Sequence, residues 1–208
     1  MNTAVSRVTL IAIALLSLAL SACDKAPEST ASTTKQLPPA PPPTADTPTA
    51  SSPLARAASR GDLAEIKTLL EGGAEVNVTD ALGRTPLHMA AFYGRTKVSE
   101  FLLISGARID ARDRIGMAPL HAAVLVGAKQ EIELLLDRKA DVNATTDAGQ
   151  TPLHLAAATG QPRISRVLIE HGANPRSEDK HGKTPIFYAA RNKHPVTTEY
   201  LQQYAAKN

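Results

Sequence analysis

Large apolar residues are distributed unevenly along the chain, and their arrangement divides it into three parts. Residues 8–20 form an apolar run that is broken only by Thr9 and Ser17. Residues 24–52 consist mainly of Pro, Thr, Ser and Ala, with almost no large apolar side chains. Beyond this stretch the pattern predicts helices whose buried stripes are recurring apolar triplets. These triplets are Phe101-Leu102-Leu103, Leu134-Leu135-Leu136 and Val167-Leu168-Ile169.

The third part of the chain is an internal repeat. A Thr-Pro-Leu-His segment and its variants recur at a constant spacing, at Thr85-Pro86-Leu87-His88, Ala118-Pro119-Leu120-His121, Thr151-Pro152-Leu153-His154 and Thr184-Pro185-Ile186-Phe187. A degenerate copy, Ser52-Pro53-Leu54-Ala55, stands one such interval before the first of them. A second marker keeps the same period, at Ala74-Glu75-Val76-Asn77, Ala107-Arg108-Ile109-Asp110, Ala140-Asp141-Val142-Asn143 and Ala173-Asn174-Pro175-Arg176. The two markers define five copies, at 52–84, 85–117, 118–150, 151–183 and 184–208.

This period and the Thr-Pro-Leu-His motif resemble those of ankyrin repeats. The resemblance covers residues 52–208. It implies an all-α solenoid of five 33-residue helix-turn-helix repeats with projecting turns. One such unit cannot bury its own apolar face, so stability comes from the stacking of neighbours. The first and last copies are expected to act as caps, because Phe187 replaces the histidine and Gln202-Gln203 makes the final helix polar.

Individual residues indicate how one unit folds. Thr151 is predicted to cap the first helix, with its hydroxyl accepting a hydrogen bond from a free backbone N–H, and Pro152 stands at the first helical position. Gly160 is predicted to end that helix. Each recurring imidazole is expected to hydrogen-bond the Thr hydroxyl and the backbone at its own turn. The structural turn and cap residues are Thr85, His88, His121, Thr151, His154 and Thr184.

The first part of the chain is typical of a secretory signal. Arg7 supplies a positive charge before the apolar run, which at about 13 residues is too short to span a bilayer. Leu20-Ser21-Ala22-Cys23 resembles the lipobox of bacterial lipoproteins, which implies removal of residues 1–22 and lipidation of Cys23. An ordinary cleavable signal with a chance cysteine is the alternative. The resemblance places the protein in the bacterial cell envelope, facing the periplasm; Asp24 favours the inner membrane, and the outer membrane stays open.

Residues 23–51 then form a tether, and its composition predicts a disordered, Pro/Thr/Ser-rich spacer. The net charge of +3 is too weak to suggest nucleic acid, whose recognition typically requires a clustered basic face, so no nucleic-acid partner is expected. The single cysteine permits no intramolecular disulfide.

The chain shows no credible catalytic constellation, so it is not expected to be an enzyme, to hold a cofactor or to take a small-molecule substrate. His88, His121 and His154 recur once per repeat, on helices about 8–10 Å apart, and cannot share one zinc ion. No metal site is therefore predicted.

Alignment of the repeats with ankyrin proteins places a partner-binding surface on the projecting turns and the ends of the first helices. Apolar pairs at two neighbouring helix ends, Phe92-Tyr93 and Leu125-Val126, predict an exposed apolar patch rimmed by positive charge. Packing of these side chains between helix and turn is the alternative. The candidate residues are Leu82, Arg84, Phe92, Tyr93, Arg114, Ile115, Met117, Leu125, Val126, Lys180 and Lys183.

The leading hypothesis is a membrane-tethered periplasmic module, acting as a monomer, that binds an envelope protein or a toxin through its concave face. The alternative is a structural or stress-related scaffold that supports a periplasmic enzyme, for instance one in oxidant defence. The sequence does not identify the partner.

Overall fold

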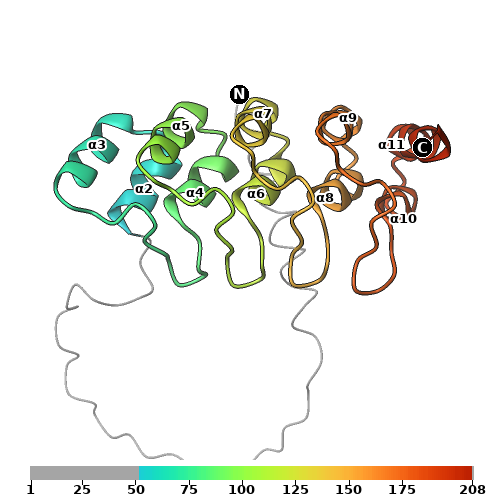
Figure 1. The fold of residues 1–208 in the computed structure, drawn as a ribbon, viewed down its shortest axis with the longest axis horizontal. Helices are drawn as coiled ribbons and strands as arrows, with labels where there is room; N and C mark the ends of the chain where they lie inside the picture. The colour runs from blue at the N-terminus through green and yellow to red at the C-terminus, as the bar shows by residue number, and fades with distance from the viewer. Residues whose placement is uncertain (1–51, 208) are drawn as a thin grey trace, which may run out of the picture. The chain divides into compact units, whose positions relative to one another are not determined.

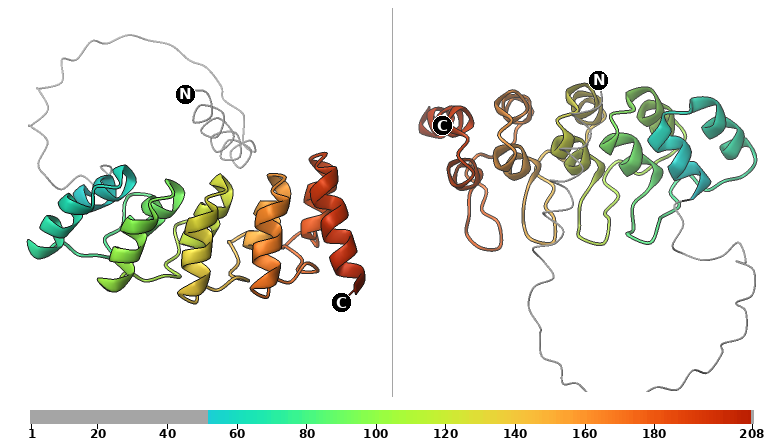
Figure 2. Two further views of the ribbon diagram at one scale, coloured as in Figure 1. Left: turned by 90° about the horizontal axis from the view of Figure 1, so that it is seen from above. Right: turned by 180° about the vertical axis from the view of Figure 1, so that it is seen from behind.

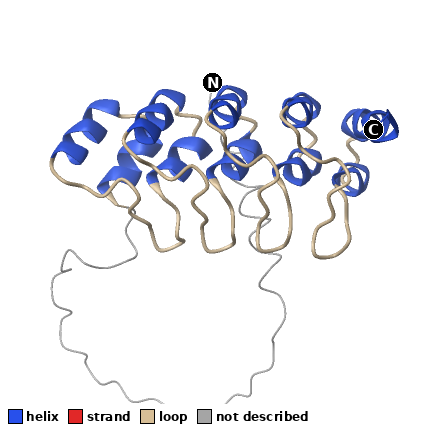
Figure 3. Ribbon diagram, in the orientation of Figure 1, coloured by secondary structure: helices blue, strands red, loops and turns tan. Residues whose placement is uncertain are grey.

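A computed structural model describes residues 52–207. The predicted signal peptide (1–22), the lipidation site Cys23 and the predicted tether (23–51) lie outside the described residues. Residues 52–207 contain ten helices and no strand (Figure 3). None of these helices has both the length and the apolar character that a crossing of the bilayer requires.

The helices alternate between two sets along the chain. The first helices, each beginning at a proline, are α2 (Pro53–Arg60), α4 (Pro86–Phe92), α6 (Pro119–Val126), α8 (Pro152–Ala158) and α10 (Pro185–Arg191). The second helices are α3 (Leu63–Glu71), α5 (Thr96–Ile104), α7 (Lys129–Asp137), α9 (Pro162–Glu170) and α11 (Pro195–Lys207).

Each first helix packs against the second helix that follows it, which gives five consecutive pairs in residues 52–207. Neighbouring pairs then stack through two layers, first helix on first helix and second helix on second helix. In Figure 1 the two layers form two parallel rows, with the connecting turns projecting beyond the row of first helices. Figure 2 shows that the helix pairs follow one another in chain order along the stack. Every repeat therefore contacts mainly its neighbours, as in a solenoid.

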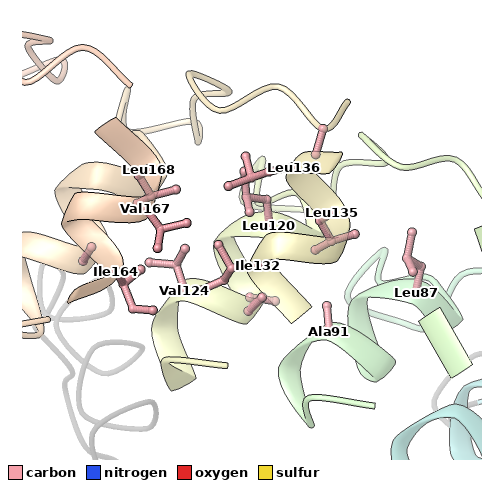
Figure 4. Close-up of a cluster of buried hydrophobic side chains, with 14 of the residues drawn as sticks. Leu87, Ala91, Leu120, Val124, Ile132, Leu135, Leu136, Ile164, Val167 and Leu168 are labelled. Atoms are coloured by element: carbon pink, nitrogen blue, oxygen red, sulfur yellow. The ribbon is translucent and has the colours of Figure 1, made fainter. Parts of the chain in front are cut away.

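Small and large apolar side chains alternate in the core. Leu87, Leu120 and Leu153 stand at equivalent positions of three first helices and are each at most 1% exposed. The alanines that follow them are also buried, which lets neighbouring helices approach closely. Figure 4 shows how leucine and valine side chains of α6, α7 and α9 converge between the layers. A core built from such thin layers needs few aromatic rings, in keeping with an aromatic content of 3%.

The first helices end at or next to a residue in the left-handed conformation. Gly127 caps α6 with φ 69°, where its N–H donates to carbonyls of the last helical turn. Glycine adopts this conformation without steric cost, and that is why it recurs after the interior first helices. In the last pair Lys193 takes the same position with φ 60°.

The hydroxyl of Thr151 does not cap the helix in the predicted way. Thr151 is the N-cap of α8, but its hydroxyl makes no cap hydrogen bond. It lies 2.9 Å from Nδ1 of His154, whose backbone N–H donates to the Thr151 carbonyl instead. At α4 the N–H of His88 does reach the Thr85 hydroxyl, at 3.4 Å. Thr184 occupies the N-cap of α10, also without a side-chain cap bond.

Four projecting turns, called fingers here, connect the repeats. They run from Asp80 to Arg84, Asp113 to Met117, Thr146 to Gln150 and Asp179 to Lys183, and in each the N–H of the first residue donates to the carbonyl of the last. Neighbouring fingers also bond through their tips. The N–H groups of Arg114, Asp147 and Lys180 donate to the carbonyls of Leu82, Ile115 and Ala148 over 2.9–3.0 Å.

A second set of contacts joins the far ends of the repeats. Asn77 accepts from the N–H of Arg108 and donates to the carbonyl of Gly106, at 2.8 and 3.1 Å. Asn143, two repeats after Asn77, makes the same two bonds with Asn174 and Gly172. Between them, Asp110 accepts from the N–H of Asp141. Asn77, Asp110 and Asn143 are called the asparagine ladder.

Candidate protein-binding surface

The fingers are held against the first helices by three buried imidazoles. His88, His121 and His154 are at most 2% exposed and stand at the same position of three consecutive repeats. Nδ1 of each ring accepts the backbone N–H of the helix N-cap residue at 3.1 Å. Nε2 faces the last carbonyl of the next finger, at 2.9 Å for Met117, 3.2 Å for Gln150 and 3.0 Å for Lys183. These three histidines, the imidazole ladder, therefore fix each finger to the first helix of its own repeat.

The hydrogen bonds assign the protonation state of the ladder. Because Nδ1 accepts an N–H, the proton of the neutral ring is on Nε2, from which it is donated to the carbonyl. A protonated ring would point a second N–H at a backbone donor. Burial lowers the pKa of His121 to about 4, although hydrogen bonds to backbone carbonyls oppose the change. Burial also lowers the pKa values of His88 and His154.

Carboxylates keep three of the four fingers in shape. Asp80 Oδ1 accepts the N–H groups of Leu82 and Arg84 at 2.8 and 2.9 Å. Asp113 and Asp179 hold their own fingers in the same way. Burial alone would raise the pKa of Asp80, but hydrogen bonds from Arg84 and from the finger backbone outweigh it and lower that pKa. The fingertips are therefore presented in a fixed conformation.

Three of the predicted partner-binding side chains are large, apolar and exposed. Leu82 and Ile115 at two fingertips are each 49% exposed, and Tyr93 at the end of α4 is 48% exposed. Tyr93 belongs to the second helix pair, and Leu82 and Ile115 lie on the fingers before and after that pair.

The other predicted apolar side chains are less available. Phe92 is half-buried because its ring packs against the hydrophobic core, with Tyr93 at 5.2 Å in an edge-to-face arrangement. Met117, Leu125 and Val126 are also half-buried. The exposed apolar patch is thus smaller than predicted, since these helix ends turn apolar side chains partly inward. Tyr93, Leu82 and Ile115 form its exposed part.

The predicted basic rim is only partly free to meet a partner. Arg84 pairs with Asp80 at 2.6 Å, and the Lys183 ammonium lies 4.7 Å from the centre of the Phe187 ring. Arg114 and Lys180 are exposed and make no ion pair with any residue in 52–207. Two of the four predicted cations therefore keep their charge available on the fingers.

Two polar contacts of this surface were not foreseen. Arg112, the residue before the second finger, pairs with Asp147 of the third finger at 3.1 Å. The Tyr188 hydroxyl donates to Asp179 at 2.5 Å and accepts from Gln150 at 3.2 Å. The only signal in the sequence is that Tyr188 stands where the preceding repeat has Leu155. The partner, Asp179, lies on a different element, and its approach depends on the three-dimensional fold.

Within residues 52–207, no group of three or more His, Cys, Asp or Glu side chains is placed to hold a metal ion. The surface offers backbone-fixed fingertips, exposed apolar side chains and free cations, which is the chemistry of protein recognition.

The family model described as Ankyrin repeats (3 copies) matches the chain three times, at residues 26–113, 54–146 and 120–208. No curated protein matches the chain. Ankyrin repeats are generic protein–protein interaction modules, and the family is typically non-enzymatic. With most of its length matched and its helices stacked in pairs, the chain belongs to the ankyrin repeat family.

Proposed function

We propose that the protein is a monomeric, membrane-tethered binding module of the bacterial periplasm, built from five 33-residue ankyrin repeats. The observation that carries the binding role is the set of exposed apolar side chains Leu82, Tyr93 and Ile115 on rigid, neighbouring elements. Monomeric soluble proteins rarely gather such side chains without a partner. The bound molecule is a protein of the cell envelope or an incoming toxin, and neither catalysis nor a cofactor is involved.

The five-repeat part of the proposal rests on the five helix pairs and on contacts that recur once per repeat. Each bond of the imidazole ladder joins a first helix to the next finger at the same sequence offset. The tethering part rests on the lipobox-like Leu20-Ser21-Ala22-Cys23 and the Pro-rich stretch after it. Several acyl chains give stable anchoring, whereas one chain alone gives marginal anchoring.

Capture of partners from envelope extracts by the tagged full chain tests the binding role. We expect the double variant Tyr93→Ser/Ile115→Ser to lose the captured protein while its thermal midpoint stays within a few degrees of the parent. The matched control is Ile104→Ser, which removes a 70% exposed side chain from the second-helix row. Equal loss of capture by the control, or full capture by the double variant, would contradict the assignment of this surface.

Labelling of cells with a palmitate analogue tests the tether. The parent chain should be labelled and fractionate with membranes, and Cys23→Ser should abolish both properties. A label that persists in Cys23→Ser, or a parent chain released into the periplasmic fluid, would refute lipid anchoring at this cysteine.

A further inference from the structure

The ends of the first helices are capped by side chains from the next repeat. The residue just before a second helix donates to a carbonyl in the last turn of the first helix of the preceding repeat. This satisfies a group that the helix itself leaves without a partner. The contacts are Arg95 Nε to the Ser59 carbonyl (3.1 Å), Gln161 Nε2 to the Val124 carbonyl (3.0 Å) and His194 Nε2 to the Ala158 carbonyl (3.1 Å).

The end of α4 is the exception within residues 52–207. The equivalent position there is Ala128, which has the same backbone conformation as Arg95 (φ −75°, ψ 76° against φ −90°, ψ 61°) but no donor. The Phe92 carbonyl corresponds by its place in the repeat to the Ser59 carbonyl. Within the described residues it receives no hydrogen bond from the following repeat.

Space is left open beside this carbonyl. A Cβ built on Gly61 would meet the Arg95 stem at 3.0 Å, and one built on Gly127 would meet the Gln161 amide at 3.2 Å. On Gly94, only the Ala128 methyl comes within 4 Å. A polar side chain thus covers Gly61 and Gly127, whereas only the methyl group of Ala128 covers Gly94. Arg95 cannot fill it, because its guanidinium is directed to α2.

The surroundings of Gly94 select a cationic donor. The carboxyl end of a helix carries partial negative charge, which favours cations. Tyr93, the residue that caps this end, is 48% exposed, and aromatic faces attract guanidinium groups. Arg95 itself shows that an arginine stem fits over the glycine of this motif. We propose that the end of α4 binds an arginine side chain of the partner protein, seated over Gly94 and donating to the Phe92 carbonyl.

This inference rests on the proposed function, since it names the anchor of the same partner, but its test does not need that partner. N-acetyl-arginine methylamide is titrated at millimolar concentration into the ¹⁵N-labelled full chain. We expect saturable amide shifts at Tyr93, Gly94 and Ala128, with a Kd of about 1–10 mM, as is usual for a single small contact. The absence of a saturable shift at Gly94 would overturn the proposal.

Two variants and a neutral probe make the test specific. Ala128→Arg copies Arg95 and Ala128→Gln copies Gln161, so each should fill the place from within and weaken the arginine probe at least about tenfold. Ala128→Arg should also raise the thermal midpoint by about 2–4 °C, because the helix end gains its cap. Probe binding unchanged in both variants would overturn the site. The citrulline analogue has the same shape without the charge, and equal binding of it would overturn the cationic assignment.

The outcome is separable from that of partner capture. If the probe binds at Gly94 but Tyr93→Ser/Ile115→Ser still captures its partner, the proposed surface fails and the arginine site stands. If the double variant loses its partner but the probe does not bind, the arginine site fails and the surface stands.

Discussion

Two sets of side-chain hydrogen bonds recur along the stack, at opposite ends of each repeat, and they differ in burial. The imidazole ladder is at most 2% exposed and bonds each finger to the preceding first helix. The asparagine ladder lies at the surface, where Asp110 and Asn143 are exposed and Asn77 is half-buried. Both use one side chain per repeat. The imidazole reaches the finger at the end of its own repeat, whereas the asparagine or aspartate reaches the backbone of the next repeat.

The two ladders tolerate change differently. His88, His121 and His154 each bond buried backbone groups through both ring nitrogens. A buried group that loses its partner keeps its desolvation cost, so substitution of these rings is expected to be costly. In the exposed ladder, Asp110 lacks the donor that Asn77 and Asn143 have, and water can solvate the backbone carbonyl instead. Burial, and not the number of bonds, therefore decides which contacts are essential.

Removal of a buried ring should give the largest effect. His121→Ala strands the Ala118 N–H, removes one of the two hydrogen bonds of the Gln150 carbonyl and leaves a cavity. We therefore expect the free energy of unfolding to fall by about 3–5 kcal/mol. Urea denaturation of the full chain measures this loss. The control, His181→Ala at an exposed fingertip, should change stability by less than about 0.5 kcal/mol. Equal losses of stability in the two variants would mean that burial does not decide which histidines stabilise the fold.

Acidification should weaken the imidazole ladder from pH 6.5 downward. A histidine whose pKa is lowered in the folded state binds its proton mainly after unfolding, so stability falls as pH drops below 6.5 towards the folded pKa. For His121 the difference between 6.5 and about 4 corresponds to roughly 3 kcal/mol. We expect the free energy of unfolding to rise with pH between 4 and 6.5 and then level off.

Three buried or bonded carboxyl groups also contribute to the pH profile. Asp80 and Asp179 have lowered pKa values, so their stabilising contribution is lost only as pH falls below 3.8. The raised pKa of buried Glu131 acts in the opposite direction, with stability lost as pH rises through that pKa. In the variant Glu131→Val, which lacks this opposing carboxyl, a flat stability profile between pH 4 and 6.5 would mean that the imidazole ladder does not stay neutral in the folded protein.

Glu131 is a buried polar group that belongs to neither ladder. It is 1% exposed on α7, at the position where neighbouring repeats have Val98 and Ile164. Neither carboxyl oxygen makes a hydrogen bond of good geometry within the described residues. Burial raises the pKa of Glu131, and the nearby hydroxyls of Ser99 and Thr96 offset only part of this increase. We expect Glu131→Val to stabilise the fold by about 1–3 kcal/mol at pH 8.

The same variant has a pH signature. Protonation removes the cost of the buried charge, so the gain from Glu131→Val should shrink when unfolding is measured at pH 5. A gain that is independent of pH would show that better packing, and not the carboxylate, is responsible. A loss of stability at pH 8 would mean that Glu131 has a compensating partner.

The sequence predicts the helical repeat well, because its markers act locally. Proline at the first helical position and glycine after the helix act within one turn, so all the first helices begin at a proline of the repeat motif. The role of the recurring imidazole at its own turn could be inferred for the same reason. Its bond to the next finger, such as that of His88 to Met117, joins two ends of one repeat that lie 29 residues apart and required the structure.

The binding surface was harder to predict, because exposure depends on side-chain direction at a helix end. Phe92 and Tyr93 are adjacent, yet the Phe92 ring packs on the core and the Tyr93 ring faces solvent. The missing cap at Ala128 is equally invisible in sequence, since alanine carries no sign of an unmet donor. Only its three equivalents, seen in place, reveal what that position lacks.

Repair of the exposed ladder should give the smallest effect. The Lys139 carbonyl is the equivalent of the Gly106 and Gly172 carbonyls that the neighbouring asparagines reach, but the carboxylate of Asp110 has no N–H to donate to it. Asp110→Asn restores that donor and keeps the bond from the Asp141 N–H, so we expect a gain of about 0.5–1.5 kcal/mol in urea denaturation. Asn143→Asp, the reverse change one repeat later, should lose a similar amount. If both substitutions are neutral, water replaces these bonds fully, and the stacking of repeats depends on the core and on the other contacts between neighbours.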